Sequence, residues 1–414
     1  MFPIDSNMIK RIVISLLLIC SLLIASGATW VYSQIDSALP ILEGKKTVFG
    51  LKNSAIIERD EQGIATIKAK SRLDVAVATG FVHAQERFFQ MDLLRRNSAG
   101  ELSSLFGSIA LNYDKSIRIH RFRDRAREIV NNLPKDQKAL IKAYTRGVNQ
   151  GLMYISSQPF EYLLLQQEPV QWTEEDSILT IFSMYIDLQY HDGQRERSLG
   201  LMKAILSADV YAFLNPKGSI WDAAIDYTQY KSSPLPDEAW PSASVSVNTS
   251  PNNDVNIANG YTKYQADEFS GSNSWGVSGN ISSTGSAIIA NDMHLGIRVP
   301  NTWFRASFEY PSNKKKIKVT GATLPGTPNM VVGSNGSIAW GFTNSYGDYS
   351  DVIKIKTIDN GKQYITPTGV KNFSFHKQII AVKDDESVEI TTKETIWGPI
   401  IGENHKGQLQ IGRA

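Results

Sequence analysis

The feature that most constrains the fold of this chain is a change of hydrophobic periodicity partway along it. Between about residues 73 and 206, apolar side chains recur at helical spacing, for example at Phe81 and Phe88. From Ser272 onward, apolar residues alternate with small or polar ones, most cleanly over residues 304–310. Helices gathered in one part of a chain and strands in another predict stacked layers rather than a βαβ repeat. We therefore expect an α+β fold.

Composition divides the chain into four segments. They are an apolar leader, a mainly helical region, a polar linker rich in Ser, Asn and Pro, and a mainly strand region, at residues 1–34, 35–231, 232–271 and 272–414. In the helical region the spacing predicts helices over about 73–106 with a break near 97–100, and over about 134–153, 174–188 and 195–206. Short strands are expected between residues 48 and 69.

The linker ends at Gly271-Ser272-Asn273-Ser274-Trp275, where a hairpin pattern begins at once. A Gly-Ser pair is ordinary in loops. However, a cut between Gly271 and Ser272 would leave Ser272 with a hydroxyl and a free α-amine at the tip of a core strand. Such an amine has a reference pKa of about 7.7–8.0, so it can act as a base near neutrality. Ser272 is therefore a candidate nucleophile.

The leader indicates export. Lys10 and Arg11 precede an apolar run over residues 12–28, and Trp30 and Tyr32 follow it. The small residues at 26–28 would suit a signal peptidase. The run is nevertheless longer than a usual signal core, and its aromatic end suits an uncleaved membrane anchor, which we favour. In both cases the rest of the chain is exported.

Charge and cysteine content set further bounds. The net charge of +2, with 42% hydrophobic residues, gives no indication of nucleic-acid binding or of disorder. The one cysteine, Cys20, lies inside the apolar leader, so the exported part has no disulfide. No phosphate-binding glycine loop or paired-cysteine metal site is present in the sequence.

Five separated blocks, in order, resemble the penicillin acylase family of N-terminal-nucleophile hydrolases. They lie at residues 80–92, 271–275, 291–296, 323–328 and 338–344. The resemblance implies an αββα four-layer sandwich and a precursor that cuts itself between Gly271 and Ser272. The resulting A and B chains would stay associated.

The resemblance also implies roles for individual residues. Ser272 would be the nucleophile and its α-amine the base, since an activated hydroxyl needs a nearby proton acceptor. Gly271, at the cleavage site, has no side chain to obstruct the attack. The backbone N–H of Asn344 would stabilise the oxyanion, and His294 would position the nucleophile rather than act as a base.

The substrate implied by the resemblance is a small N-acyl amide, either penicillin-like or acyl-homoserine-lactone-like. Neither can be preferred from the sequence. The acyl pocket would be lined near Ile186, Gln189, Tyr190 and Leu295, a mixed polar and apolar set.

A structural calcium ion (Ca2+) is implied as well, bound by carboxylates and carbonyl oxygens as a hard cation requires. Glu196 would contribute from the A chain, and Asp348, Ser350 and Asp351 from the B chain. Without the resemblance, the same acids would be taken as solvated turn and helix residues.

The sequence departs from the family pattern at its end. The segment after Ser272 is shorter than the family's B chain, and a second oxyanion donor and further calcium ligands have no counterpart here. We therefore expect a C-terminally truncated form with an incomplete fold. Two functions stay open: an exported, self-processing amidohydrolase, or a catalytically inactive, membrane-tethered remnant of the same fold.

Overall fold

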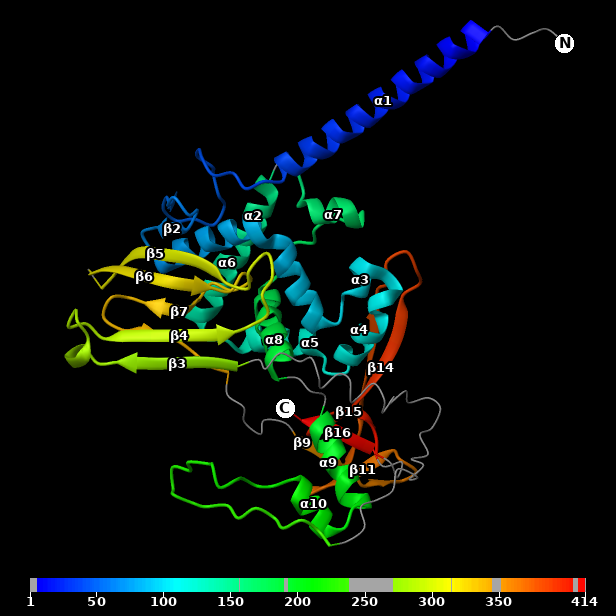
Figure 1. Ribbon diagram of the computed structural model, residues 1–414, viewed down its shortest axis with the longest axis vertical. Helices are drawn as coiled ribbons and strands as arrows, with labels where there is room; N and C mark the ends of the chain where they lie inside the picture. The colour runs from blue at the N-terminus through cyan, green and yellow to red at the C-terminus, as the bar shows by residue number, and fades with distance from the viewer. Residues whose placement is uncertain are drawn as a thin grey trace, which may run out of the picture. The chain divides into compact units, whose positions relative to one another are not determined.

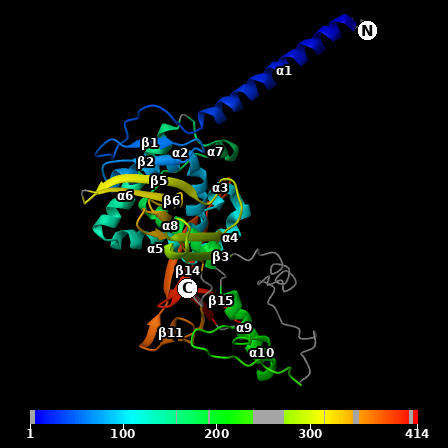
Figure 2. The same ribbon diagram turned by 60° about the vertical axis from the view of Figure 1, so that its left-hand side comes forward.

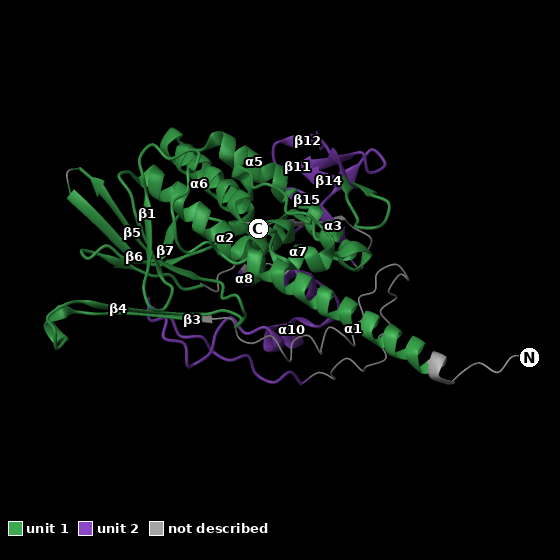
Figure 3. Cartoon of the chain, turned by 90° about the horizontal axis from the view of Figure 1, so that it is seen from above, with its two compact units in different colours: residues 1–187, 272–344, 379–390 green, residues 188–271, 345–378, 391–414 purple. Residues whose placement is uncertain are grey.

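The structure, a computed structural model, describes residues 6–155, 157–189, 193–237, 271–313, 315–344, 351–404 and 409–413. The chain divides into two compact units, each built from separated stretches of sequence (Figure 3). Unit 1 comprises Met1–Asp187, Ser272–Asn344 and Ile379–Ile390. Unit 2 comprises Leu188–Gly271, Ser345–Gln378 and Thr391–Ala414. Most of the linker predicted at 232–271 lies outside the described residues.

Helices dominate the first part of unit 1 (Figure 1). They are α1 Ser6–Ser37, α2 Arg72–Ala99, α3 Ser103–Phe106, the 3-10 helix η1 Gly107–Ala110, α4 Leu111–Arg118, α5 Phe122–Asn132, α6 Lys135–Tyr154, α7 Phe160–Leu165 and α8 Glu174–Gln189. The helices predicted near 73–106, 134–153 and 174–188 are confirmed, and α2 ends in the predicted break. Gly100 closes α2 in the left-handed conformation, with φ 64°, which glycine adopts without strain.

The strands of unit 1 form a six-stranded sheet, in the order β1-β2-β5-β6-β7-β8, and a separate β3-β4 hairpin. Their bounds are β1 Ile56–Arg59, β2 Ala65–Lys68, β3 Gly271–Val277, β4 Ile288–His294, β5 Phe304–Ser312, β6 Lys315–Thr323, β7 Met330–Ser334 and β8 Ala339–Trp340, with the 3-10 helix η2 Gly279–Ile281 inside the hairpin. The short strands expected between 48 and 69 and the hairpin expected from Ser272 are confirmed.

One strand pair joins the sequence segments of unit 1 that precede and follow the linker. β2 lies parallel to β5, with Ala65 opposite Ala306 and Lys68 opposite Glu309. The other pairs described in this sheet are antiparallel. Because β1 and β2 precede the linker and β5 follows it, the sheet is built from residues on both sides of the Gly271–Ser272 bond.

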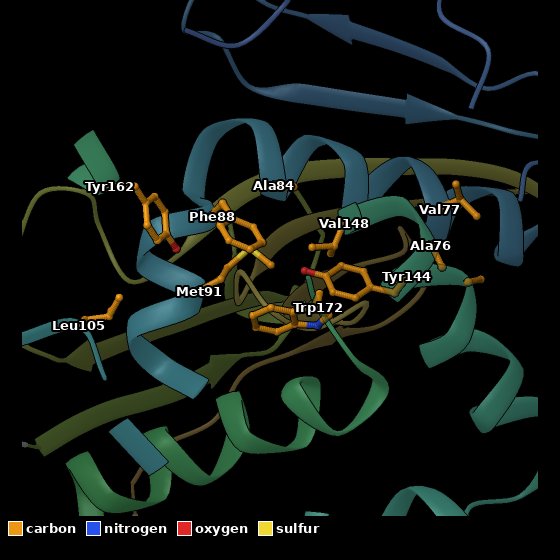
Figure 4. Close-up of a cluster of buried hydrophobic side chains, with 11 residues drawn as sticks. Ala76, Val77, Ala84, Phe88, Met91, Leu105, Tyr144, Val148, Tyr162 and Trp172 are labelled. Atoms are coloured by element: carbon orange, nitrogen blue, oxygen red, sulfur yellow. The ribbon is translucent and has the colours of Figure 1, made fainter. Parts of the chain in front are cut away.

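Helices α2 and α6 pack together on one face of the sheet (Figures 1, 2 and 3). Their close approach depends on glycine: a Cβ at Gly147 would lie 2.0 Å from the carbonyl oxygen of Val77. The core between the helices contains Phe88, Met91, Tyr144 and Trp172 (Figure 4), and a second cluster, including Val75 and Phe308, joins α2 to the sheet. Burial of these apolar surfaces is the main stabilising contribution to unit 1.

A buried ion-pair network stabilises the C-terminal part of α2. Arg95 bonds Asp92 and Asp176, both at 2.7 Å, and Arg123 bonds Asp176 at 3.0 Å. The hydroxyl of Tyr162 donates to the second oxygen of Asp92 at 2.7 Å. The N–H of Thr173 donates to Asp176 at 2.8 Å. Both buried carboxylates therefore have charged and neutral donors, which is the condition for burying them without a large penalty.

Unit 2 is smaller. Its helices are α9 Gln194–Ile205 and α10 Ala208–Leu214, and α9 matches the helix predicted near 195–206. Its strands form a three-stranded sheet, β10-β11-β12, and most of a five-stranded sheet, β13-β14-β15-β16-β9. Their bounds are β9 Asp351–Lys354, β10 Thr357–Ile358, β11 Gln363–Thr366, β12 Gly369–Asn372, β13 Ser374–Ile380, β14 Val388–Thr395, β15 Gly398–Glu403 and β16 Leu409–Arg413. The α+β class is confirmed.

Candidate active site

The candidate nucleophile lies at the start of the β3-β4 hairpin. Gly271 and Ser272 are the first two residues of β3, and the side chain of Ser272 is half-buried. The partner strand β4 runs back alongside β3 and ends at His294 (Figure 1). His294 and the Gly271–Ser272 bond are therefore at the same end of the hairpin.

The carboxamide of Asn291 joins this hairpin to the segment that carries Asn344. Its Nδ2 donates to the carbonyl oxygen of Asn273 at 3.3 Å and to that of Phe342 at 2.9 Å. Its Oδ1 accepts from the N–H of Phe342 at 3.3 Å. One side chain thus links the residue after Ser272 to the residue two before Asn344, and Asn344 itself is half-buried.

The glycine before Phe342 makes room for this link. A Cβ at Gly341 would lie 2.8 Å from the carboxamide carbon of Asn291, closer than real Cβ atoms approach. Asn291 was not predicted as a functional residue, although it lies in one of the five blocks. A strand asparagine gives no sequence signal for a bond to a loop some fifty positions away.

His294 has a defined partner on its own strand. Its Nε2 lies 2.9 Å from Oδ2 of Asp292, and the two side chains are 45% and 62% exposed. Residues two apart on a strand point to the same face, which explains the pairing. The carboxylate orients the ring at the nucleophile's end of the hairpin, and this is compatible with a positioning role.

Of the predicted acyl-pocket residues, the structure describes Ile186 and Leu295 fully, and both are half-buried. Ile186 lies near the end of α8, and Leu295 directly follows β4, next to His294. The side chain of Gln189 and all of Tyr190 lie outside the described residues.

Two of the predicted calcium ligands come from neighbouring elements of unit 2. A Cβ at Gly193 would lie 2.5 Å from Cγ2 of Val352 and 3.9 Å from Oε2 of Glu196, so the start of α9 lies against β9. Asp351 is the first residue of β9, is exposed, and accepts from the N–H of Val352 at 2.8 Å. Segments from before and after the linker, α9 and β9, thus lie side by side in unit 2.

The remaining predicted ligands, Asp348 and Ser350, lie outside the described residues. Within the described part of the chain, no group of three or more His, Cys, Asp or Glu side chains could hold a metal ion. Glu196 and Asp351 therefore remain predicted calcium ligands, and the described residues alone do not form a metal site.

A chain of hydrogen bonds through His83 ties the helices to the strand region. The N–H of Gly326 donates to the hydroxyl of Tyr144 at 2.9 Å, and that hydroxyl lies 2.8 Å from Nδ1 of His83. On the other side, Nε2 of His83 lies 2.9 Å from Oγ1 of Thr323, which donates to the carbonyl oxygen of Phe304 at 3.0 Å. A neutral ring with its proton on Nε2 satisfies all of these bonds, including the one that the Tyr144 hydroxyl donates.

Burial explains the same protonation state. His83 is fully buried, and this desolvation, together with the charge of Arg87, lowers its pKa to about 3. A neutral, fully bonded histidine in a core has a structural function. Burial likewise raises the pKa of Tyr144.

A model of the penicillin amidase family matches residues 54–412. The chain therefore belongs to the penicillin amidase family. It is 25% identical over 385 residues to the acyl-homoserine lactone acylase QuiP of Pseudomonas aeruginosa, covering 91% of this chain and 43% of that protein. It is 26% identical to the penicillin acylase 2 proenzyme of Pseudomonas sp. strain SE83, covering 89% of this chain and 46% of that protein. The chain thus spans less than half the length of these relatives.

Among solved structures, the chain is similar to a thermostable penicillin G acylase from Alcaligenes faecalis. The TM-score is 0.36 and the identity 22%, over 45% of this chain and all of the other. The names of the relatives support an amidohydrolase function for the family to which this chain belongs.

Proposed function

We propose that this chain belongs to an amidohydrolase that cleaves the amide bond of N-acyl substrates, with Ser272 as the nucleophile. The observation that carries the proposal is the link made by Asn291, whose carboxamide bonds Asn273 and Phe342. It joins the strand of the candidate nucleophile to the segment of the candidate oxyanion donor, Asn344. An acyl-transfer site needs these two groups at a fixed separation.

Self-cleavage would come first. The Ser272 hydroxyl adds to the carbonyl carbon of Gly271, and the proton passes to the nitrogen of Ser272 as the C–N bond breaks. Water then hydrolyses the ester, leaving a carboxylate on Gly271 and a free amine on Ser272. The absence of a side chain on Gly271 keeps the carbonyl accessible.

The mature site would repeat the chemistry on a substrate. The free amine of Ser272 takes the hydroxyl proton, through a water, as the oxygen attacks the amide carbon. The N–H of Asn344 stabilises the oxyanion, and loss of one such donor typically lowers kcat by about 10²–10³. The leaving amine takes a proton, and water releases the acid and regenerates the Ser272 hydroxyl.

After the cut, the two chains would stay together. The pairing of β2 with β5 crosses the cut, and so does the chain of bonds through His83. Arg72 also donates to the carbonyl oxygen of Pro328 at 2.6 Å, and Arg87 to that of Asn301 at 2.9 Å. The bonds of His83 are buried and that of Arg72 is partly buried, so water competes little for them and they would help to keep the two chains associated.

Calcium would strengthen the same association in unit 2. Glu196 and Asp351, with Asp348 and Ser350, would hold the ion through oxygen atoms from both sides of the cut. Bound there, the ion would supply charge neutralisation among these acids and no chemistry at Ser272.

The leader supports an exported location. One helix in the described residues, over Lys10–Ser37, is long and apolar enough to cross a membrane, and its most apolar stretch is not buried in the protein. We propose that it is an uncleaved anchor holding the enzyme at the outer face of the inner membrane. A cleaved signal is the alternative, and the mass of the mature chain distinguishes the two.

Hydrolysis assays test the function. The complete gene product is incubated with a penicillin, with an acyl-homoserine lactone and with their N-acyl amide analogues, and release of the acid is measured. The proposal expects hydrolysis of at least one class, and loss of that activity in Ser272→Ala. A properly folded product that hydrolyses none of them would favour the inactive, membrane-tethered remnant.

A further inference from the structure

The end of the apolar leader helix is fixed to unit 1 at one defined place. Oγ of Ser157 donates to Oε1 of Gln34 at 2.8 Å, and the N–H of Ser157 donates to the carbonyl oxygen of Ser37 at 3.2 Å. Gln34 and Ser37 are accordingly half-buried, whereas residues 10–33 of α1 are exposed. The direction in which α1 leaves unit 1 is therefore set by hydrogen bonds.

Helix α7 begins three residues after Ser157 and lies beside the end of α1 (Figures 1 and 3). It has two apolar faces. Tyr162 is buried and bonds Asp92, and Leu165 packs on the core. On the opposite face, Phe160 and Leu164 are 44% and 77% exposed. Their spacing of four residues puts them side by side on the surface.

The segment that directly follows α1 also exposes apolar side chains. Leu39 and Leu42 are 58% and 61% exposed. Two cations, Lys45 and Lys46, follow and are exposed as well. Apolar groups gathered at the exit of an apolar helix are unusual for a water-facing surface and indicate a partner.

The length of α1 indicates at what depth in the membrane these exposed apolar side chains would lie. From Arg11 to Trp30 the helix rises about 28 Å, close to the roughly 30 Å of a bilayer's hydrocarbon core. Basic residues at the first end and aromatic residues at the second are the flanks that a spanning helix prefers. Ser37 lies about 7 Å beyond Tyr32 along the helix, which is the depth of the headgroup layer.

We propose that Leu39, Leu42, Phe160 and Leu164 form a juxtamembrane patch that inserts into the headgroup region of the membrane that α1 spans. The inference rests on the proposed anchoring by α1 and is independent of the proposed chemistry. It assigns to α7 a peripheral contact with lipid, with Lys45 and Lys46 beside it for anionic headgroups. Unit 1 would then hold a fixed orientation on the bilayer rather than swing on a tether.

The acidic residues near the patch are compatible with this contact. Glu161 lies on α7 between its two faces, and burial raises its pKa, which eases its approach to the interface. Asp36 and Glu43 are exposed and balance the charges of Lys45 and Lys46, so the contact with lipid would depend mainly on the apolar side chains.

A fluorophore on a single cysteine tests the contact in the full chain. Cys20, the only cysteine, is replaced in Cys20→Ser, and Leu164→Cys is labelled in that background. The protein is reconstituted in vesicles of phosphatidylethanolamine and phosphatidylglycerol that carry nitroxide lipids labelled near the headgroup. Ile109→Cys is the matched control, because Ile109 is an 87% exposed apolar residue of η1 in the same unit.

The proposal expects headgroup nitroxides to quench the label at position 164 several-fold more strongly than the label at 109. Equal quenching at the two positions overturns it. A label on native Cys20 tests separately whether α1 is inserted in the membrane. If nitroxides deep in the acyl chains do not quench this label, α1 is not inserted, and the proposal is also overturned. Phe160→Cys provides a second probe of the patch should Leu164→Cys fold poorly. None of these results bears on amide hydrolysis.

Discussion

Replacing Asn291 tests whether its carboxamide sets the spacing between nucleophile and oxyanion donor. Asn291→Ala removes the bonds to Asn273 and to both backbone groups of Phe342. Hydrogen bonds contribute about 0.5–1.5 kcal/mol each, and these lie at the lower end because two are long, so the free energy of unfolding should fall by about 2 kcal/mol.

The effect on chemistry should exceed the effect on stability. If the segment of Asn344 shifts, part of the stabilisation by one oxyanion donor is lost. Complete loss corresponds to about 10²–10³ in rate, so we expect self-cleavage to slow by about 10- to 100-fold. Asn291→Asp should be at least as slow, because it replaces the donor with an anion that faces the carbonyl oxygens of Asn273 and Phe342.

The assay follows the appearance of the two fragments with time, alongside thermal unfolding. Asn335→Ala is the matched control: Oδ1 of Asn335 accepts from the N–H groups of Ser337 and Ile338 in a turn of the same unit. The control should lose comparable stability and cleave at the normal rate. Normal cleavage by Asn291→Ala, or equal slowing in the control, would refute the reasoning.

Three further predictions follow from the contacts across the cut. The pKa of His83 is about 3 in the folded state and about 6.5 in the unfolded state, so the unfolded state binds more protons between these two pH values. The free energy of unfolding, measured with urea, should therefore fall as the pH drops from 6.5 towards 3, and less steeply in His83→Gln. An equal pH dependence of the two proteins would contradict this. The two fragments of the processed protein should elute together in size-exclusion chromatography at neutral pH without denaturant, because the β2–β5 pairing spans the cut; separate elution would contradict the interlocked sheet. A calcium chelator should lower the unfolding temperature of the intact protein but not that of Glu196→Gln. Glu61→Gln, at an exposed position, is the control and should respond as the intact protein does. An equal decrease in all three proteins would show that Glu196 is not a calcium ligand.

Local patterns predicted much of the fold. The break after Ala99 was predicted from residues 97–100, and the structure shows Gly100 closing the helix. The hairpin starting at Ser272 followed from alternation and a turn, since both depend on neighbours in sequence. The ordered family blocks predicted the family, and the match over residues 54–412 confirms it.

Long-range pairing could not be predicted in this way. Nothing in residues 65–68 indicates that they pair with residues 306–309, because a short apolar strand carries no information on its partner. The same holds for Asn291, whose function depends on where a distant loop lies. The division into units also follows contacts in space, so it interleaves segments that composition had treated as consecutive.

The most direct test of the central claim is the intact mass of the complete gene product after expression. Self-processing predicts two fragments, and the amino-terminal sequence of the second begins at Ser272. Ser272→Ala should remain a single chain, whereas Ser272→Cys should still cut and hydrolyse amides poorly. A folded, uncut wild-type protein, or a cut at any other bond, would contradict the assignment of Ser272 as the nucleophile.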